Sequence, residues 1–142
     1  MQLLSLKNHA AILLLLISFL LLSPLVTAEA SSEKVYEMRT YIAAPGKLDD
    51  LHARFRDHTT RIFTKHHMKV IGYWVPVDKD NSKTTLIYIL EHASADAAKS
   101  SWAAFGKDPE WQAVAKASNA NGAILADIKN SFMTATDYSP VR

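Results

Sequence analysis

Two neighbouring stretches, residues 69–77 and 84–92, are apolar on both of the faces that a β-strand would present, and they limit the possible folds more than any other part of the sequence. They read KVIGYWVPV and TTLIYILEH, with the polar turn DKDNSK between them, which is typical of a β-hairpin. Pro76, near the end of the first stretch, indicates an edge strand. Because side chains alternate along a strand, both faces of a sheet that contains this hairpin must be covered.

Two further strands are predicted at the two ends of the domain. Residues 35–42, VYEMRTYI, are rich in β-branched and aromatic side chains and predict a first strand. Residues 124–136, ILADIKNSFMTAT, fit either a helix or a strand, and we predict a final strand from their alternation. The first strand has one apolar face and one polar face, and the polar face carries Glu37, Arg39 and Tyr41.

Between the first strand and the hairpin, residues 45–68 (PGKLDDLHARFRDHTTRIFTKHHM) have the periodicity of a long amphipathic helix. At about 100° per residue, its apolar side chains share one arc that must be buried. They are Leu48, Leu51, Phe55 and Ile62, with Phe63 at the margin. On the other side, Asp50 with Arg54 and Asp57 with Arg61 stand four residues apart, and we expect these pairs to form a solvated face.

Two more helix starts follow the hairpin. Ser94 can cap one helix, and Asp108 followed by Pro109 can begin another, because Asp is a favoured N-cap and Pro is favoured at the first helical position. The predicted order is then β-α-β-β-α-β. This order predicts an α+β fold of the ferredoxin-like type, with an antiparallel sheet and helices on one face.

Helices on one side leave the other face of this sheet without a cover. The sequence has no cysteine, so the chain cannot use disulfides, and its stability must come from packing. A second copy of the chain, packed sheet against sheet, is the simplest cover for the apolar residues of the open face. We therefore expect a homodimer.

The first thirty residues differ from the rest of the chain. Lys7 precedes an apolar run at residues 10–22, and Ser23, Pro24 and small residues follow. This pattern predicts a secretory signal peptide, residues 1–30, cleaved after Ala28 or Ala30, and one mature domain, residues 31–142. Retention of the segment as an anchor is the alternative, although the apolar run is short for a bilayer span. The mature protein is expected to be exported, periplasmic or extracellular, with no stable membrane span.

Composition and motifs narrow the possible partners. A formal net charge of +2 argues against nucleic acid as the main partner. The sequence contains no G-x-G-x-x-G, P-loop, G-x-S-x-G or H-E-x-x-H pattern. We predict no metal site and no cofactor, with haem kept as an alternative.

Six residues are candidates for contact with a ligand: Arg39, Tyr41, His58, His66, Tyr73 and Trp74. Arg39 is the sharpest candidate, because a buried arginine needs an anionic partner, which could be Glu37, the facing subunit or a ligand carboxylate. The two histidines also fit a structural role, packed between layers and hydrogen-bonded. The hairpin aromatics would border the space where a two-layer barrel holds its ligand.

The mature sequence resembles the NIPSNAP family through several motifs that occur in order. They are VYEMRTY at residues 35–41, PGK at 45–47, RFRDH at 54–58, GYW at 72–74, SWAAF at 101–105, DPEW at 108–111 and TDYSP at 136–140. The resemblance implies a dimeric α+β barrel, in which two ferredoxin-like units pack their sheets together, and it implies no settled reaction. Eukaryotic members are associated with mitochondria and membrane trafficking, whereas the predicted signal peptide indicates an exported bacterial member.

Two functions follow from these patterns. The first is a small homodimeric module that binds a small apolar or anionic molecule, or a protein partner. The alternative is an enzyme of the dimeric α+β barrel type, either a cofactor-independent monooxygenase or a haem-handling protein. That enzyme would use Arg39 with His58 or His66 to hold an anionic, aromatic substrate. The surroundings of Arg39 separate the two, because an internal ion pair without an adjoining cavity removes the main support for the enzyme.

Overall fold

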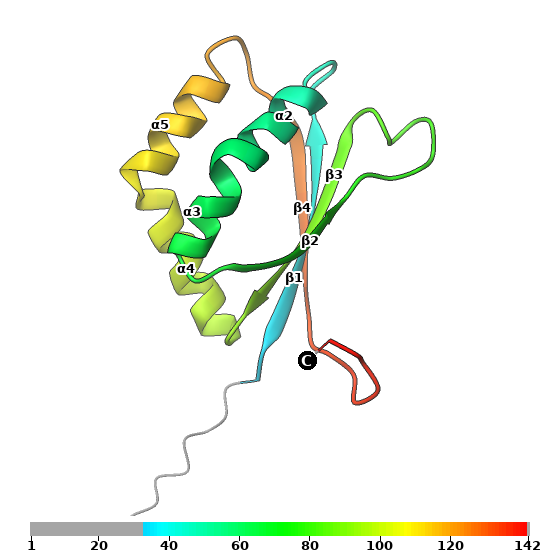
Figure 1. Cartoon of the computed structure of the whole chain (residues 1–142), viewed down its shortest axis with the longest axis vertical. Helices are drawn as coiled ribbons and strands as arrows, with labels where there is room; N and C mark the ends of the chain where they lie inside the picture. Colours follow the sequence, from blue (N-terminus) through cyan, green and yellow to red (C-terminus); the bar gives the residue numbers. More distant parts are fainter. Residues whose placement is uncertain (1–32, 142) are drawn as a thin grey trace, which may run out of the picture. The chain divides into compact units, whose positions relative to one another are not determined.

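The computed structural model describes residues 33–141, and its elements alternate in the predicted order (Figure 1). The elements are β1 (Val35–Ala43), α2 (Leu48–Arg54), the π-helical segment η1 (Phe55–Thr59), α3 (Thr60–Lys65), β2 (Lys69–Trp74), β3 (Thr85–His92), α4 (Ala95–Lys107), α5 (Pro109–Ser118) and β4 (Leu125–Met133). The predicted α+β, ferredoxin-like fold is confirmed. The predicted signal peptide, residues 1–30, lies outside the described residues.

The four strands form one antiparallel sheet in the order β2-β3-β1-β4. The first and last strands are therefore neighbours, and Arg39 in the middle of β1 lies between Tyr88 of β3 and Asn130 of β4. Pro76 follows β2, which is an edge strand as predicted. The described helices all lie on one side of this sheet in Figure 1.

The helix predicted for residues 45–68 is one helical rod from Leu48 to Lys65 that contains a π-helical turn. The hydroxyl of Thr59 donates a hydrogen bond to the carbonyl oxygen of Arg54 (3.2 Å), and that of Thr60 donates to the carbonyl oxygen of Phe55 (2.8 Å). Both bonds span five residues, so the threonines supply extra donors to the carbonyls of the widened turn. A periodicity of 100° per residue assumes a uniform helix and cannot predict this turn.

The two later helices begin at the predicted caps. The Oγ of Ser94 accepts a hydrogen bond from the backbone N–H of Ala97 (3.0 Å) at the start of α4. The Oδ1 of Asp108 accepts one from the backbone N–H of Glu110 (2.8 Å), with Pro109 in the first turn of α5. Both caps are confirmed, because side-chain oxygens satisfy N–H groups that have no partner within the helix.

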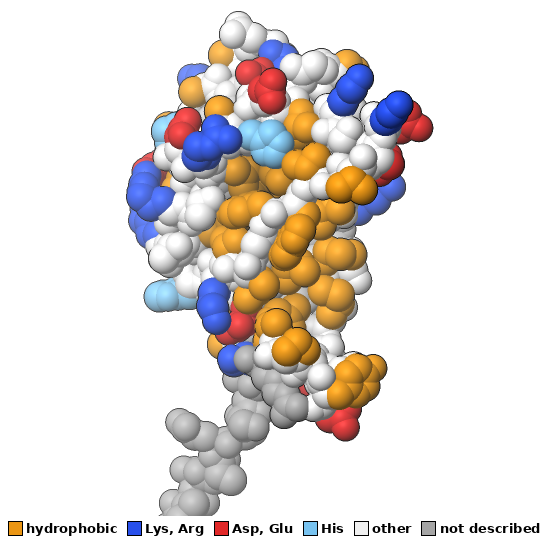
Figure 2. All heavy atoms as spheres, turned by 45° about the vertical axis from the view of Figure 1, so that its right-hand side comes forward, with side chains coloured by type: hydrophobic (Ala, Val, Ile, Leu, Met, Phe, Trp, Pro, Cys, Tyr) orange, Lys and Arg blue, Asp and Glu red, His pale blue; other side chains and the backbone are white. Residues whose placement is uncertain are grey.

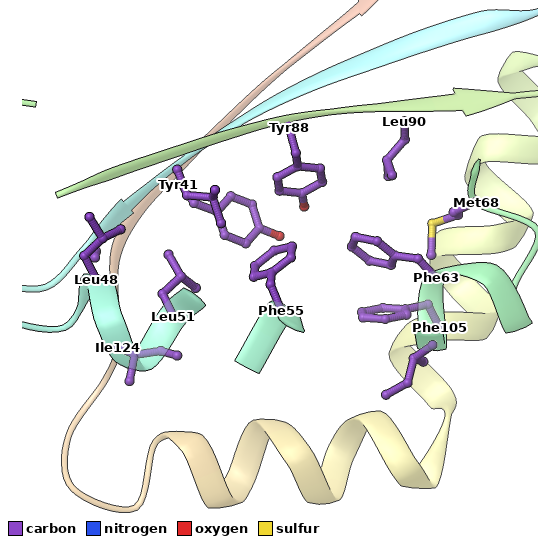
Figure 3. Packing of buried hydrophobic residues seen from close by; sticks show 13 residues of the cluster. Tyr41, Leu48, Leu51, Phe55, Phe63, Met68, Tyr88, Leu90, Phe105 and Ile124 are labelled. Atoms are coloured by element: carbon purple, nitrogen blue, oxygen red, sulfur yellow. The ribbon is translucent and has the colours of Figure 1, made fainter. Parts of the chain in front are cut away.

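The hydrophobic core lies between the sheet and the helices (Figure 3). Phe63 of α3 is almost fully buried, and its ring packs against those of Tyr88 on β3 and Phe105 on α4, with centroid separations of 5.8 and 5.2 Å. The apolar arc predicted for the first helix is confirmed. Its buried members are Leu48, Leu51, Phe55, Ile62 and Phe63.

The opposite face of the sheet carries no described helix. Tyr41, Tyr88 and Leu90 point into the core in Figure 3, so their alternating neighbours on β1 and β3 lie on the open face. Met38 and Ile89 are directly paired there, and the Met38 residue is 37% exposed. Figure 2 shows hydrophobic side chains gathered in a band over this side of the molecule. The open face is therefore apolar and partly exposed in the single chain.

Candidate functional site

A buried polar cluster lies on the helix-covered face of the sheet, with Glu37 at its centre. Glu37 is fully buried. It accepts hydrogen bonds from Arg39 Nη1 (2.7 Å) and Trp102 Nε1 (2.6 Å). His92 Nε2 lies 3.1 Å away and Asn130 Nδ2 is a longer donor at 3.4 Å. The donors belong to β1, α4, β3 and β4, so one carboxylate joins three strands and a helix.

Glu37 remains ionised within this cluster. Burial alone would disfavour the charge, but hydrogen bonds from His92 and Trp102, together with the charge of Arg39, outweigh it and lower the pKa of Glu37 from 4.5 to about 2. Because an ionised carboxylate can only accept, the hydrogen bond from His92 requires a proton on its Nε2. The cluster therefore holds a buried negative charge at neutral pH.

The structure gives Arg39 an internal partner. Its side chain is 15% exposed and pairs with Glu37, and its guanidinium carbon lies 4.2 Å from the ring centroid of Trp102. Burial acts to lower the pKa of Arg39, but the neighbouring Tyr41, Tyr88 and Glu37 outweigh it and raise the pKa above its usual value. Neither of the two cavities described below is lined by Arg39. The guanidinium is therefore held by protein groups, as in the first of its three predicted alternatives.

Tyr41 lies in the core and lines neither of the two cavities. Its ring makes edge contacts with Phe55 and Tyr88, at centroid separations of 5.7 and 5.1 Å. The Tyr88 hydroxyl is buried without a hydrogen-bond partner in the described part of the chain, and burial raises the pKa of this phenol well above 10. These rings fill the space between sheet and helices.

The hairpin aromatics Tyr73 and Trp74 point to opposite faces of β2. The Tyr73 hydroxyl lies 2.7 Å from Thr60 Oγ1 on the helix side, and burial raises the pKa of this tyrosine. Trp74 lies on the open face, where its ring covers Gly72 so closely that a Cβ at this glycine would come within 2.8 Å of it. The two side chains therefore do not line one aromatic pocket.

The two candidate histidines belong to different clusters. His66 is half-buried, and its Nε2 lies 2.6 Å from Asp108 Oδ2. Lys65 Nζ lies 2.7 Å from the same oxygen, and Lys65 and His66 together hold the pKa of Asp108 well below its usual range. His66 thus ties the end of α3 to the cap of α5. His58 is exposed and lines a cavity on another part of the first helix.

That cavity, of about 590 Å³, lies between the first helix and α5. Arg54 in its wall is only 6% exposed. Its Nη1 donates a long hydrogen bond of 3.4 Å to Ser118 Oγ, its guanidinium carbon lies 5.2 Å from the ring centroid of Trp111, and its Nε is buried without a partner in the described part of the chain. Burial lowers the pKa of Arg54 below its usual value. A second cavity, of about 300 Å³, is lined by Tyr36 and residues 135–137 among others.

The predicted solvated face of the first helix is confirmed for Asp50 and Arg61, which are exposed, but is wrong for Arg54, which is buried. Asp50 pairs with Lys47 (2.9 Å) and not with Arg54, while Arg61 pairs with Glu110 of α5. Within residues 33–141, Arg54 has no carboxylate at ion-pair distance. The reason is that α5 lies beside α2 and covers the flank on which Arg54 stands. An isolated helix does not reveal which of its flanks a second helix will cover.

Sequence reasoning missed most residues of both sites. It named Arg39 and His58 but expected Arg54 in solvent, and it did not name Trp102 or His92 as candidates for contact with a ligand. Its one usable signal was the pairing of Glu37 with Arg39 on the polar face of the first strand. Among residues 33–141, no three His, Cys, Asp or Glu side chains are grouped so that they could hold a metal ion. None of the described helices has the length and apolar character needed to cross a membrane.

Comparisons with known proteins agree with this architecture. The model of the family described as NIPSNAP matches residues 36–140. A NIPSNAP family protein from Agrobacterium tumefaciens is similar in structure, with a TM-score of 0.68 and 24% identity over 78% of this chain and 100% of that chain. A NIPSNAP-like domain protein from Burkholderia xenovorans has a TM-score of 0.66 and 18% identity over 76% of this chain and 90% of that chain. The search of curated proteins gave no match.

An oxygenase also shares the fold. SnoaB, a cofactor-independent oxygenase from Streptomyces nogalater, is similar with a TM-score of 0.52 and 15% identity over 77% of this chain and 99% of that chain. At such identities, likeness to a solved structure shows the fold alone.

Proposed function

The chain belongs to the NIPSNAP family, and on that premise we propose that its mature domain is an exported, homodimeric binding module. In this proposal the open face of the sheet forms the dimer contact. The ligand that the domain binds is a small molecule. The observation that carries the proposal is the apolar open face, because a single chain leaves it in water.

The composition of the open face supports a contact with a second copy. Trp74 of β2 is 47% exposed and Met38 of β1 is 37% exposed, and the partly buried Ile87 and Ile89 of β3 lie between them. Charged groups stand at the end of this apolar strip, where Glu91 pairs with Lys69 of β2 and with Lys34 just before β1. An apolar centre with a charged rim is the usual composition of a homodimer interface.

Placing a charge in the centre of the open face is expected to separate the dimer. Met38→Glu would bury a carboxylate without a partner in the interface, which costs several kcal/mol, whereas in a monomer the same side chain reaches water. Multi-angle light scattering of the mature domain at micromolar concentration is expected to give twice the chain mass for the wild type and the single chain mass for the variant.

The matched control is Ala104→Glu, which adds the same charge at an exposed position of α4, on the helix layer. This variant is expected to keep the dimer mass, and circular dichroism should be unchanged for both variants. A wild-type domain that is monomeric under these conditions would contradict the sheet-to-sheet dimer.

Export rests on the first thirty residues of the sequence, where Lys7, the apolar run at 10–22 and small residues have the layout of a signal peptide. Expression of the whole chain in a Gram-negative host is expected to give a periplasmic protein whose first residue is Glu29 or Ser31. N-terminal sequencing and intact mass measure this directly. A product that retains Met1 and sediments with membranes would indicate an anchor instead.

The geometry of the site does not support the alternative functions, an oxygenase or a haem-handling protein. Both require Arg39 to be free for an anionic substrate, and its guanidinium is held by Glu37 and packed on Trp102. His58 and His66 stand in separate clusters, so neither completes a site with Arg39. The likeness to SnoaB concerns the fold, and neither enzymatic function is proposed.

A further inference from the structure

Arg54 is a buried cation that the described part of the chain leaves without a carboxylate. Taking a charge out of water is strongly unfavourable unless an opposite charge or a full set of hydrogen bonds compensates it. Arg54 has one long hydrogen bond to Ser118 and the face of Trp111, and its Nε has no acceptor within residues 33–141. The buried Nε of Arg39 also lacks a partner among the described residues, but Arg39, unlike Arg54, has a carboxylate at 2.7 Å. Arg54 lines a cavity that is large enough to admit an anionic partner.

The charges around the cavity define the anion that fits. Lys47 is already neutralised by Asp50 at 2.9 Å, and Asp57 adds a negative charge at an exposed position of the rim. Arg54 is thus the one cation of the cavity wall that lacks an acidic partner among the described residues. A single negative charge can pair with Arg54, whereas the second charge of a dianion would be repelled by Asp57 on the rim.

The shape of the cavity indicates an organic ligand. Its volume of about 590 Å³ is within the range of small-molecule sites and far exceeds the volume of a bare ion. The wall that α5 contributes consists largely of small apolar side chains, Ala113, Val114 and Ala117. The planar fork of an arginine matches the two oxygens of a carboxylate.

We propose that the cavity between α2 and α5 binds a small organic carboxylate, with the carboxylate on Arg54 and the apolar body of the ligand against α5. This inference names the ligand class for the proposed binding function, and it rests on that proposed function. The cavity belongs to a single chain and does not include the open face of the sheet, so the site and the dimer can fail separately.

Isothermal titration calorimetry of the mature domain with benzoate and with butyrate tests the site. Both are expected to bind, while chloride and inorganic phosphate at the same ionic strength are expected to give no saturable heat. Arg54→Met keeps the length of the side chain and removes the charge, and it is expected to weaken benzoate binding about tenfold or more. Its melting temperature in the absence of ligand should be equal to or above that of the wild type, because an uncompensated charge is removed.

Two further variants keep the test decisive if Arg54→Met folds poorly. Ala117→Leu leaves Arg54 in place and fills the cavity from an exposed position of α5, and it is expected to exclude benzoate. Arg56→Met, on the same helix but outside the cavity, is the matched control and is expected to bind benzoate like the wild type.

Each of the following results applies to a wild-type domain that is folded, and each tests a different part of the proposal. Benzoate binding that persists in both Arg54→Met and Ala117→Leu would overturn the site. Equal effects of chloride and carboxylates, or tighter binding of phosphate, would overturn the ligand class. Light scattering on the same samples reports the dimer, so a monomeric wild type that still binds benzoate would contradict the dimer alone.

Discussion

Replacing Glu37 with glutamine is expected to lower the free energy of unfolding by about 3 kcal/mol at pH 7. The pKa of Glu37 falls from 4.5 to about 2 on folding, and each unit of pKa corresponds to about 1.4 kcal/mol. Glutamine keeps the size of the side chain but removes the charge that Arg39, His92 and Trp102 surround. The amide nitrogen of glutamine would also place two N–H donors beside neighbouring side chains that are donors themselves.

The effect depends on pH in a defined direction. Because the pKa of Glu37 is lower in the folded protein, its contribution is complete above about pH 4.5 and is lost as the pH falls toward 2. The difference in unfolding free energy between wild type and Glu37→Gln should therefore shrink over this range. Urea unfolding followed by circular dichroism at pH 7, 4.5 and 3 measures it.

The control for this experiment is Asp80→Asn, which removes an acid at an exposed position of the hairpin turn. Its unfolding curves are expected to follow those of the wild type at each pH. A Glu37→Gln variant as stable as the wild type at pH 7 would mean that the cluster contributes no net stability.

Truncation of Phe63 to alanine is expected to cost about 3–5 kcal/mol, since the ring is almost fully buried and its removal leaves a cavity. The ring touches aromatic neighbours on two elements, with centroids 5.6 Å from Trp102 and 5.2 Å from Phe105 of α4 and 5.8 Å from Tyr88 of β3. A small domain is usually stable by about 5–15 kcal/mol, so this one substitution removes a large share. Thermal and urea unfolding measure the loss.

Phe132→Ala is the matched control, because the side chain at this position of β4 is 50% exposed in the single chain. We expect it to cost much less than Phe63→Ala in the same assay. Equal losses for the two variants would show that the core is not centred on α3 as the structure has it.

Elements whose cause is local could be predicted from the sequence. The alternation of residues 35–42, the turn between the hairpin strands, and the caps at Ser94 and Asp108 each depend on a few neighbouring residues, and all are present. The order of these elements then predicts the topology, because few arrangements place two helices on a four-stranded antiparallel sheet.

The site residues could not be predicted in the same way, because they meet only in the folded chain. Three of the donors to Glu37, which are His92, Trp102 and Asn130, follow it in the sequence by 55, 65 and 93 residues. Arg54 was expected in solvent because its own helix offered it Asp50, and only the position of α5 shows that it is buried. The π-helical turn likewise depends on hydroxyls that read as ordinary surface threonines in the sequence.

The pairing of the first strand with the last has a consequence for the newly synthesised chain. β1 is a central strand, but one of its edges is closed by β4, which is made more than eighty residues later. Until β4 has emerged, β1 keeps a free edge, and Glu37 lacks its contact with Asn130. The domain therefore reaches its stable form only after β4 has been made, so a shorter nascent chain stays accessible to chaperones and to proteases.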